Sequence, residues 1–241
     1  QVTAEHFNDG KLAGKGSLGP TTPVSINSIS ESTYSVVCYK QGTHILCQDG
    51  PVRVEDLKVG QMVLTADGSH EPIIWIGQRS LDCSTHPNPD KAYPVCIHQN
   101  AFGAGLPERD LFVSPDHSLF IDGVMVPAFC LIDGEKITQN RQETEVTYYH
   151  VELPAHFAIF AEGLMAESYL DTTEANRMFF NRSAASASTT DEKSFVFADK
   201  PHDMPTWQYV WQTQGYAPLV TSGEKLQQVI QRISTPDLIA A

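Results

Sequence analysis

Four Asp-Gly pairs, each set between short apolar runs, constrain the fold of this chain more than any other feature. They lie at residues 49–50, 67–68, 122–123 and 133–134. Asp-Gly suits a two-residue hairpin turn, because both central positions of that turn need a positive φ. Four hairpins predict an all-β domain that runs from Cys38 to about Leu170.

The segment that begins at His44 resembles the segment that begins at His117. The first reads HILCQDG and the second reads HSLFIDG. Two β-rich halves of similar pattern suggest an internally duplicated, pseudo-symmetric fold. Because hairpins share turn residues in any case, the sequence leaves both duplication and a chance likeness open.

The chain is acidic and has no apolar run long enough for a membrane helix. Lys and Arg total 16 against 29 Asp and Glu in 241 residues, which gives a net charge of −13. An acidic surface repels phosphate backbones, so we expect no nucleic acid partner. A membrane helix needs roughly 20 apolar residues, so we expect no membrane insertion.

The five Cys are an odd number, so at least one thiol lies outside any internal disulfide.

Composition divides the rest of the chain into an arm and a tail. We interpret residues 1–37, rich in Gly, Ser, Thr and Asn, as an upstream arm or the end of a preceding module, in a chain that is a fragment or a processed form. In the tail, residues 183–193 are of low complexity and predict a loop. A helix is predicted over about 222–234, where TSGE at 221–224 fits a capping box and apolar residues follow at helical spacing.

Cys38 stands where the composition changes. The sulfur of a Cys that opens a domain can attack the carbonyl carbon of the preceding residue, here Val37, and convert the amide into a thioester. The fold must then hold that bond strained and supply an acid to its nitrogen, because an unprotonated amide nitrogen is a poor leaving group. The alternative is a small buried hydrophobe, which is how most free Cys behave.

Two His residues are candidate partners of this sulfur. His117 follows Ser114 at a predicted turn between two strands, where the Ser114 hydroxyl or a backbone group can hold one ring nitrogen. The alternative is a His that satisfies a carbonyl at a strand corner. His150 lies in an alternating strand and can deprotonate Cys38 or assist the departure of the amide nitrogen. The alternative is an outward-facing strand His.

Other clusters do not match known metal or cofactor patterns. His44 with Cys47, and Cys96 with His98, are not spaced like a zinc site with four close ligands. No segment resembles a calcium loop or a phosphate-binding loop. We therefore expect no metal and no cofactor.

Five blocks together resemble the Hint superfamily, which contains inteins, Hedgehog C-terminal regions and bacterial intein-like proteins. The blocks are residues 38–43 (CYKQGT), 52–60 (VRVEDLKVG), 111–123 (LFVSPDHSLFIDG), 149–153 (YHVEL) and 157–169 (FAIFAEGLMAESY). Ser114 stands where the family has Thr, and His150 stands where many inteins carry Asp.

The resemblance implies the fold and the domain boundaries. A pseudo-two-fold, horseshoe-shaped Hint fold is expected over residues 38–171, with residues 172–241 as a C-terminal extension. The family habit of the bacterial branch also suggests an extracellular or cell-surface location.

The resemblance also implies an autocatalytic, single-turnover cleavage of the Val37–Cys38 bond. Cys38 is expected to be the nucleophile, with Ser114, His117 and His150 as the other catalytic residues. The substrate is the N-terminal flanking segment, and water, a thiol or an amine is the acceptor. Splicing inteins close with His-Asn, whereas this chain has Glu167-Ser168, so cleavage without splicing is expected.

Two other functions stay open from the sequence. The domain can be a catalytically inactive, β-rich structural or adhesion module. It can also be a Cys–His hydrolase that acts on a separate substrate, which requires an open cleft beside Cys38.

Overall fold

The computed structural model describes residues 37–171, 201 and 203–235. Within them it contains fourteen strands and two α-helices, so the all-β fold with a C-terminal helix is confirmed. Of the predicted arm at 1–37, only Val37 is described. The loop predicted at 183–193 lies outside the described residues.

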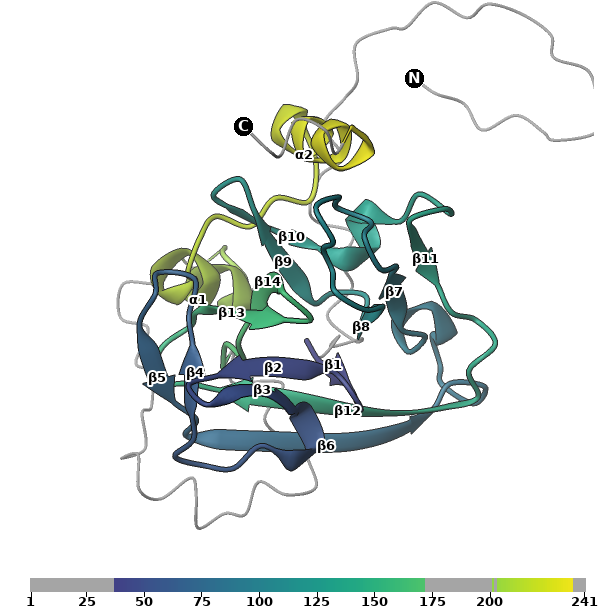
Figure 1. The fold of residues 1–241 in the computed structure, drawn as a ribbon. Coiled ribbons are helices and arrows are strands. Elements are labelled where there is room, and N and C mark those ends of the chain that lie inside the picture. The colour runs from purple at the N-terminus through teal and green to yellow at the C-terminus, as the bar shows by residue number, and fades with distance from the viewer. Residues whose placement is uncertain (1–36, 172–200, 202, 236–241) are drawn as a thin grey trace, which may run out of the picture. The chain divides into compact units, whose positions relative to one another are not determined.

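The first sheet has six strands, and the strand that follows Cys38 lies inside it. Its order is β11 (Ile137–Gln139), β7 (Val95–Ile97), β8 (Leu111–Val113), β1 (Tyr39–Lys40), β12 (Glu145–Glu152) and β6 (Trp75–Asp82). The strands β12 and β6 run side by side over eight residues each (Figure 1). β12 reads EVTYYHVE, and its β-branched and aromatic residues favour a strand.

The second sheet has eight strands and contains both of the similar segments. Its order is β10 (Val124–Pro127), β9 (Ser118–Ile121), β14 (Leu164–Glu167), β13 (Ala158–Ala161), β2 (His44–Cys47), β4 (Met62–Leu64) and β5 (His70–Pro72), with β3 (Gly50–Arg53) also paired to β2. The β13–β14 hairpin pairs with β2 on one side and with β9 on the other. The two similar segments therefore flank one central hairpin, as a pseudo-two-fold arrangement requires.

Three of the four Asp-Gly pairs lie at hairpins, and the fourth does not. The hairpins are β2–β3, β4–β5 and β9–β10. Asp122 and Gly123 have φ values of 52° and 78°, as the predicted turn requires. The fourth prediction is wrong, because the Asp133 carboxylate accepts hydrogen bonds from the backbone N–H groups of residues 135–137 and shapes a loop before β11.

A hairpin that the Asp-Gly pattern does not mark joins β13 to β14. Glu162 and Gly163 form its turn, with φ values of 47° and 83°. The Glu162 carboxylate accepts hydrogen bonds from the Arg109 guanidinium and from the His44 backbone N–H. These contacts hold a Glu where the turn rule favours Asn or Asp.

One hydrophobic core joins the two sheets and α2 (Glu224–Ser234). Tyr39 and Ile97 enter it from the first sheet, and Ile45 and Leu119 from the second. Each of these four side chains is at most 1% exposed. Tyr39, the first residue of β1, is therefore buried in the core.

The tail packs on this body through α1 (Thr206–Gln214) and α2. Residues 218–220 run beside β10, where the Met125 N–H donates to the Pro218 carbonyl and the Val220 N–H donates to the Met125 carbonyl. On α2, Leu226, Val229 and Ile233 are buried, as the helical spacing predicts.

The predicted capping box at the start of α2 is wrong. Gly223 is the N-cap residue, with φ of 85°, and no side chain caps the helix. A Gly at this position places the backbone in the left-handed region, which breaks the spacing that a Thr221–Glu224 box needs.

The described residues contain no helix that combines the length and the apolar character of a membrane span. All five Cys are free thiols, in agreement with the odd count. Four of them are buried, and Cys130 is partly exposed.

Candidate active site at Cys38

The Val37–Cys38 bond leads directly into the interior of the first sheet. Tyr39, the first residue of β1, pairs with Val113 of β8 and with Tyr149 of β12. Because β1 is held on both sides, the residue before it is held as well. Cys38 is 2% exposed, while Val37 is half-buried.

His150 of β12 contacts the Cys38 sulfur. The distance from Cys38 Sγ to His150 Nε2 is 2.8 Å, and His150 is 1% exposed. The ring of Tyr169 packs edge-on against the His150 ring, with centroids 5.2 Å apart. Of the two orientations that the sequence left open, His150 takes the inward one.

Ser114 holds the amide side of the scissile bond. The Cys38 N–H donates to Ser114 Oγ at 2.8 Å, and the Ser114 N–H donates to the Cys38 carbonyl at 2.9 Å. Of the two groups that the sequence offered to hold the His117 ring, the Ser114 hydroxyl lies at the Cys38 amide, whose N–H it accepts. The Ser114 carbonyl also restrains His117, because it accepts the His117 backbone N–H at 3.1 Å.

The His117 ring packs on Tyr39, beside the Cys38 backbone. The two ring centroids lie 4.3 Å apart, and His117 is 1% exposed. Among the described residues, neither ring nitrogen has a well-formed hydrogen bond. Burial lowers the pKa of His117 to about 4, although the Glu167 carboxylate and the Cys38 backbone act in the opposite direction. The imidazole is therefore neutral at pH 7.

The sulfur and its neighbouring imidazole are both uncharged in the resting site. Burial raises the pKa of the Cys38 thiol well above its usual value, against weaker effects of Arg79 and the Ser114 hydroxyl. Burial, with help from His117 and Arg79, lowers the pKa of His150 well below its usual value. A protonated thiol thus faces a neutral ring, so the S–H can donate to His150 Nε2, as a general base requires.

A buried layer behind His117, which sequence reasoning missed, contains Glu167 and His156. The Ser118 N–H donates to Glu167 Oε1, and His156 Nε2 lies 3.3 Å from Glu167 Oε2, with both side chains fully buried. His156 Nδ1 accepts the Tyr216 N–H at 3.0 Å, which leaves the ring proton on Nε2 and aims it at Glu167. The signal available in the sequence was Glu167 at the end of the apolar stretch Leu164-Met165-Ala166, beyond the turn that contains Glu162.

Glu167→Ala is expected to lower the free energy of unfolding by about 3 kcal/mol, because it leaves the buried Ser118 N–H and the His156 ring without an acceptor. Glu167→Gln keeps one acceptor and should cost less. Urea denaturation measures both values. Glu145→Ala, at the exposed start of β12, is the control and should change stability by less than about 0.5 kcal/mol. A cost for Glu167→Ala as small as that of the control would contradict the assignment.

The free energy of unfolding is expected to fall as the pH is lowered from about 6.5 to about 4. The pKa of His117 is about 4 in the folded chain and near 6.5 in the unfolded chain, so the unfolded chain binds the proton first. The contribution of His117 to the free energy of unfolding is therefore fully present above pH 6.5. It decreases as the pH is lowered to about 4, by about 3 kcal/mol. His150 contributes in the same direction.

Urea denaturation at several pH values within this window measures the slope. His117→Asn should flatten it, whereas the exposed His70→Asn should leave it unchanged. Equal stability of the unmodified chain at both ends of the window would refute the buried, neutral state of His117.

Several solved structures resemble the chain at low sequence identity. They include a bacterial intein-like domain from Clostridium thermocellum (14% identity, TM-score 0.42, covering 55% of this chain and 98% of that one). The MchDnaB-1 intein is 13% identical, with a TM-score of 0.39, and the match covers 54% of this chain and 99% of that one. A DnaB intein from Synechocystis is 10% identical, with a TM-score of 0.38, and the match covers 55% of this chain and 99% of that one. No curated protein matches the chain.

A family model matches the part of the chain that forms the two sheets. It is the model of the Hint domain, and it covers residues 37–173, which is more than half of the chain. The match begins at the residue before Cys38 and includes Ser114, His117 and His150. The chain belongs to the Hint domain family.

Proposed function

We propose that the chain cleaves its own Val37–Cys38 bond by an N-to-S acyl shift and does so without splicing. The observation that carries this proposal is the convergence of three segments on that one bond. The Cys38 sulfur has His150 at 2.8 Å, the Cys38 amide nitrogen has the Ser114 hydroxyl at 2.8 Å, and the His117 ring lies beside the same backbone.

In the first step, His150 takes the thiol proton as the sulfur attacks. Cys38 Sγ forms a bond to the Val37 carbonyl carbon, and the S–H proton moves to His150 Nε2. The raised pKa of the thiol means that a free thiolate is rare, so proton transfer must accompany attack. The 2.8 Å contact supports this coupling.

In the second step, the bond between the Val37 carbon and the Cys38 nitrogen breaks. The proton that His150 took from the thiol passes to the nitrogen, which becomes the α-amine of Cys38, so the thiol proton is conserved overall and His150 is neutral again. The hydrogen bond to Ser114 orients the nitrogen, and the neutral His117 ring beside the Cys38 backbone polarises the Val37–Cys38 amide nitrogen. The product is a thioester between Val37 and Cys38.

The thioester is then released by an external nucleophile. Water, a thiol or an amine attacks the Val37 carbonyl carbon and returns the sulfur of Cys38 to a thiol. Asn cyclisation is not available at the end of β14, because Glu167 and Ser168 stand where inteins have His-Asn. This proposal makes the N-terminal segment the substrate.

A hydrolase that acts on a separate substrate fits the site less well. Cys38 is 2% exposed and its backbone continues into Val37, so a second peptide has no direct access to the sulfur. The observation that favours self-processing is therefore the burial of the nucleophile together with its own upstream bond.

The test is intact-mass measurement of the purified chain during incubation, with and without hydroxylamine or a thiol. Cleavage between Val37 and Cys38, accelerated by either nucleophile, is expected. A chain whose mass does not change under any of these conditions supports an inactive structural module instead.

A further inference from the structure

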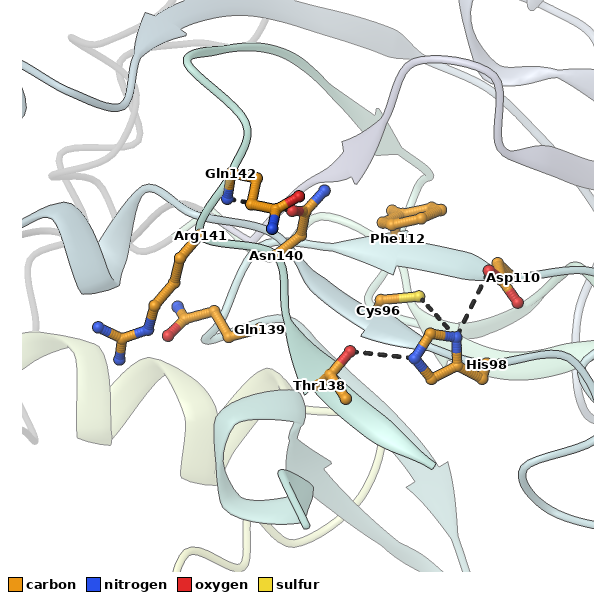
Figure 2. Close-up of a pocket in the computed structure, with 9 residues that line it drawn as sticks. All are labelled: Cys96, His98, Asp110, Phe112, Thr138, Gln139, Asn140, Arg141 and Gln142. Atoms are coloured by element: carbon orange, nitrogen blue, oxygen red, sulfur yellow. Dashed lines mark hydrogen bonds and ion pairs between the residues drawn. The ribbon is translucent and has the colours of Figure 1, made fainter. Parts of the chain in front are cut away.

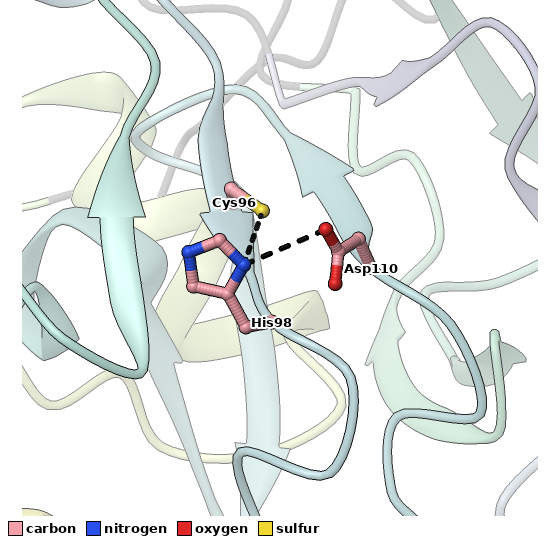
Figure 3. Close-up of side chains that lie close together, drawn as sticks. All are labelled: Cys96, His98 and Asp110. Atoms are coloured by element: carbon pink, nitrogen blue, oxygen red, sulfur yellow. Dashed lines mark hydrogen bonds and ion pairs between the residues drawn. The ribbon is translucent and has the colours of Figure 1, made fainter.

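Cys96, His98 and Asp110 place three potential metal ligands together, and none of them belongs to the Cys38 site. Cys96 Sγ lies 3.5 Å from His98 Nδ1, and Asp110 Oδ2 lies 3.5 Å from the same nitrogen (Figure 3). All three donor atoms lie within 4.8 Å of one another. Cys96 is buried, whereas the His98 and Asp110 side chains are 43% and 45% exposed.

This cluster does not have the geometry of a Cys–His–Asp catalytic triad. Such a triad needs the Cys and the Asp on opposite ring nitrogens, so that a proton passes through the imidazole. Here both groups face Nδ1, while Nε2 lies 3.1 Å from Thr138 Oγ1. With the ring proton on Nε2 and donated to Thr138, the Nδ1 lone pair points toward the sulfur and the carboxylate.

We propose that Cys96 Sγ, His98 Nδ1 and Asp110 Oδ2 bind one Zn²⁺ ion. Zinc lies about 2.3 Å from sulfur and about 2.0–2.1 Å from nitrogen or oxygen, so tetrahedral ligands are separated by about 3.5 Å. The two distances that involve His98 Nδ1 agree with this separation. A set of thiolate, imidazole and carboxylate suits zinc, whereas Mg²⁺ and Ca²⁺ prefer oxygen ligands alone.

The strand ladder sets these side chains in position. Cys96 lies in β7 and His98 follows two residues later, so both point to one face of the strand. Asp110 directly precedes β8, which pairs with β7 through Leu111 and Ile97, and this register brings residues 98 and 110 opposite each other.

A second layer of contacts orients two of the ligands. The Gln99 N–H donates to Asp110 Oδ1 at 2.7 Å, which turns Oδ2 toward His98. Thr138 of β11 holds the His98 ring from its other nitrogen. Such contacts fix the orientation and the tautomer of metal ligands.

A cavity of about 400 Å³ next to the cluster provides room for a fourth ligand. Its wall includes all three proposed ligands as well as Phe112, Thr138 and residues 139–142 (Figure 2). Zinc sites with three protein ligands keep the fourth position open for water or a small molecule. We therefore assign that position to a water molecule in the cavity.

Metal binding replaces the thiol proton. Cys96–SH releases a proton to solvent as the sulfur–zinc bond forms, and the two anionic ligands then match the charge of the ion. Burial and the Asp110 carboxylate raise the pKa of Cys96 to about 12, which disfavours the thiolate until a cation lies beside it. The net charge of −13 also attracts cations to the surface.

The test uses the full chain with Cys38→Ala, which removes the other close thiol–imidazole pair. The protein is stripped of metal and titrated with Zn²⁺ by calorimetry and with Co²⁺ by absorption spectroscopy. Binding of one equivalent is expected, with a thiolate-to-cobalt charge-transfer band. Asp110→Asn, which keeps the Oδ1 acceptor, should weaken Zn²⁺ binding by at least about tenfold.

Cys96→Ser should remove the charge-transfer band, and Cys130→Ser is the matched thiol control that should retain it. If Cys96→Ser does not fold, the Zn²⁺ affinity of Asp110→Asn is compared with that of the exposed Asp49→Asn, and this comparison tests the proposal. The proposal is overturned by an absence of saturable binding, by a band that persists in Cys96→Ser, or by an Asp110→Asn affinity equal to that of the control.

Discussion

Cys38→Ala is expected to leave the chain uncleaved, even after prolonged incubation with hydroxylamine or a thiol. Alanine removes the only atom in the proposed mechanism that can form a bond to the Val37 carbonyl carbon. Without that bond no thioester exists for the added nucleophile to attack, and the rate falls to that of an ordinary peptide bond. Intact mass over time measures the fraction of uncleaved chain.

Cys130→Ser is the matched control for this experiment, because its thiol lies outside the site and is partly exposed. It should cleave at the rate of the unmodified chain. If Cys38→Ala still breaks between residues 37 and 38 at that rate, the nucleophile has been assigned to the wrong atom.

His150→Ala should slow the acyl shift by roughly 10²–10⁴-fold, the usual contribution of a general base. The pH dependence of the variant tests whether a free Cys38 thiolate can replace the missing base. Because burial raises the pKa of the Cys38 thiol well above its usual value, an increase from pH 7 to about 9 should not restore the rate by forming thiolate.

Added imidazole, which can enter the space left by the ring, should restore part of the rate. His70→Ala, at an exposed position, is the control and should cleave normally. Unchanged kinetics in His150→Ala would show that the sulfur reacts without this ring, despite the 2.8 Å contact.

The candidate active site was predictable from the sequence to the extent that its residues occur in recognisable blocks. Cys38 marks a change of composition, and His117 and His150 lie in strand patterns that can be read locally. The inward orientation of His150 was not predictable, because it depends on the register of β12 against β6 and β1. A shift of one residue would turn this ring to the other face of the sheet.

Contacts between distant segments account for what the sequence did not reveal. The Ser114 hydroxyl meets the Cys38 amide only because β1 pairs with β8, and the residues around Ser114 do not contain that pairing. The spacing of Cys96 and His98 does not match a zinc site with four close ligands, so the sequence predicts no metal there. Asp110, the third proposed ligand, lies on a separate segment and joins them only through the pairing of β7 with β8.

The fold was more predictable than the site because its signals are local. Asp122-Gly123 forms the predicted turn, and the apolar spacing locates α2. The exceptions are positions where side-chain hydrogen bonds override the pattern, as at Asp133 and Glu162. Such bonds depend on neighbours that the one-dimensional pattern does not contain.

The entry and the exit of the two-sheet body meet at one place. The Tyr39 hydroxyl donates to the Glu167 carbonyl at 2.8 Å, and Tyr169, two residues further on, packs against His150. A body with adjoining ends can be grafted between two segments of an unrelated host without forcing those segments apart. Residues 38–169 have such adjoining ends, but α2 packs into the same core, so a graft that keeps this fold stable has to include the tail as far as Ser234.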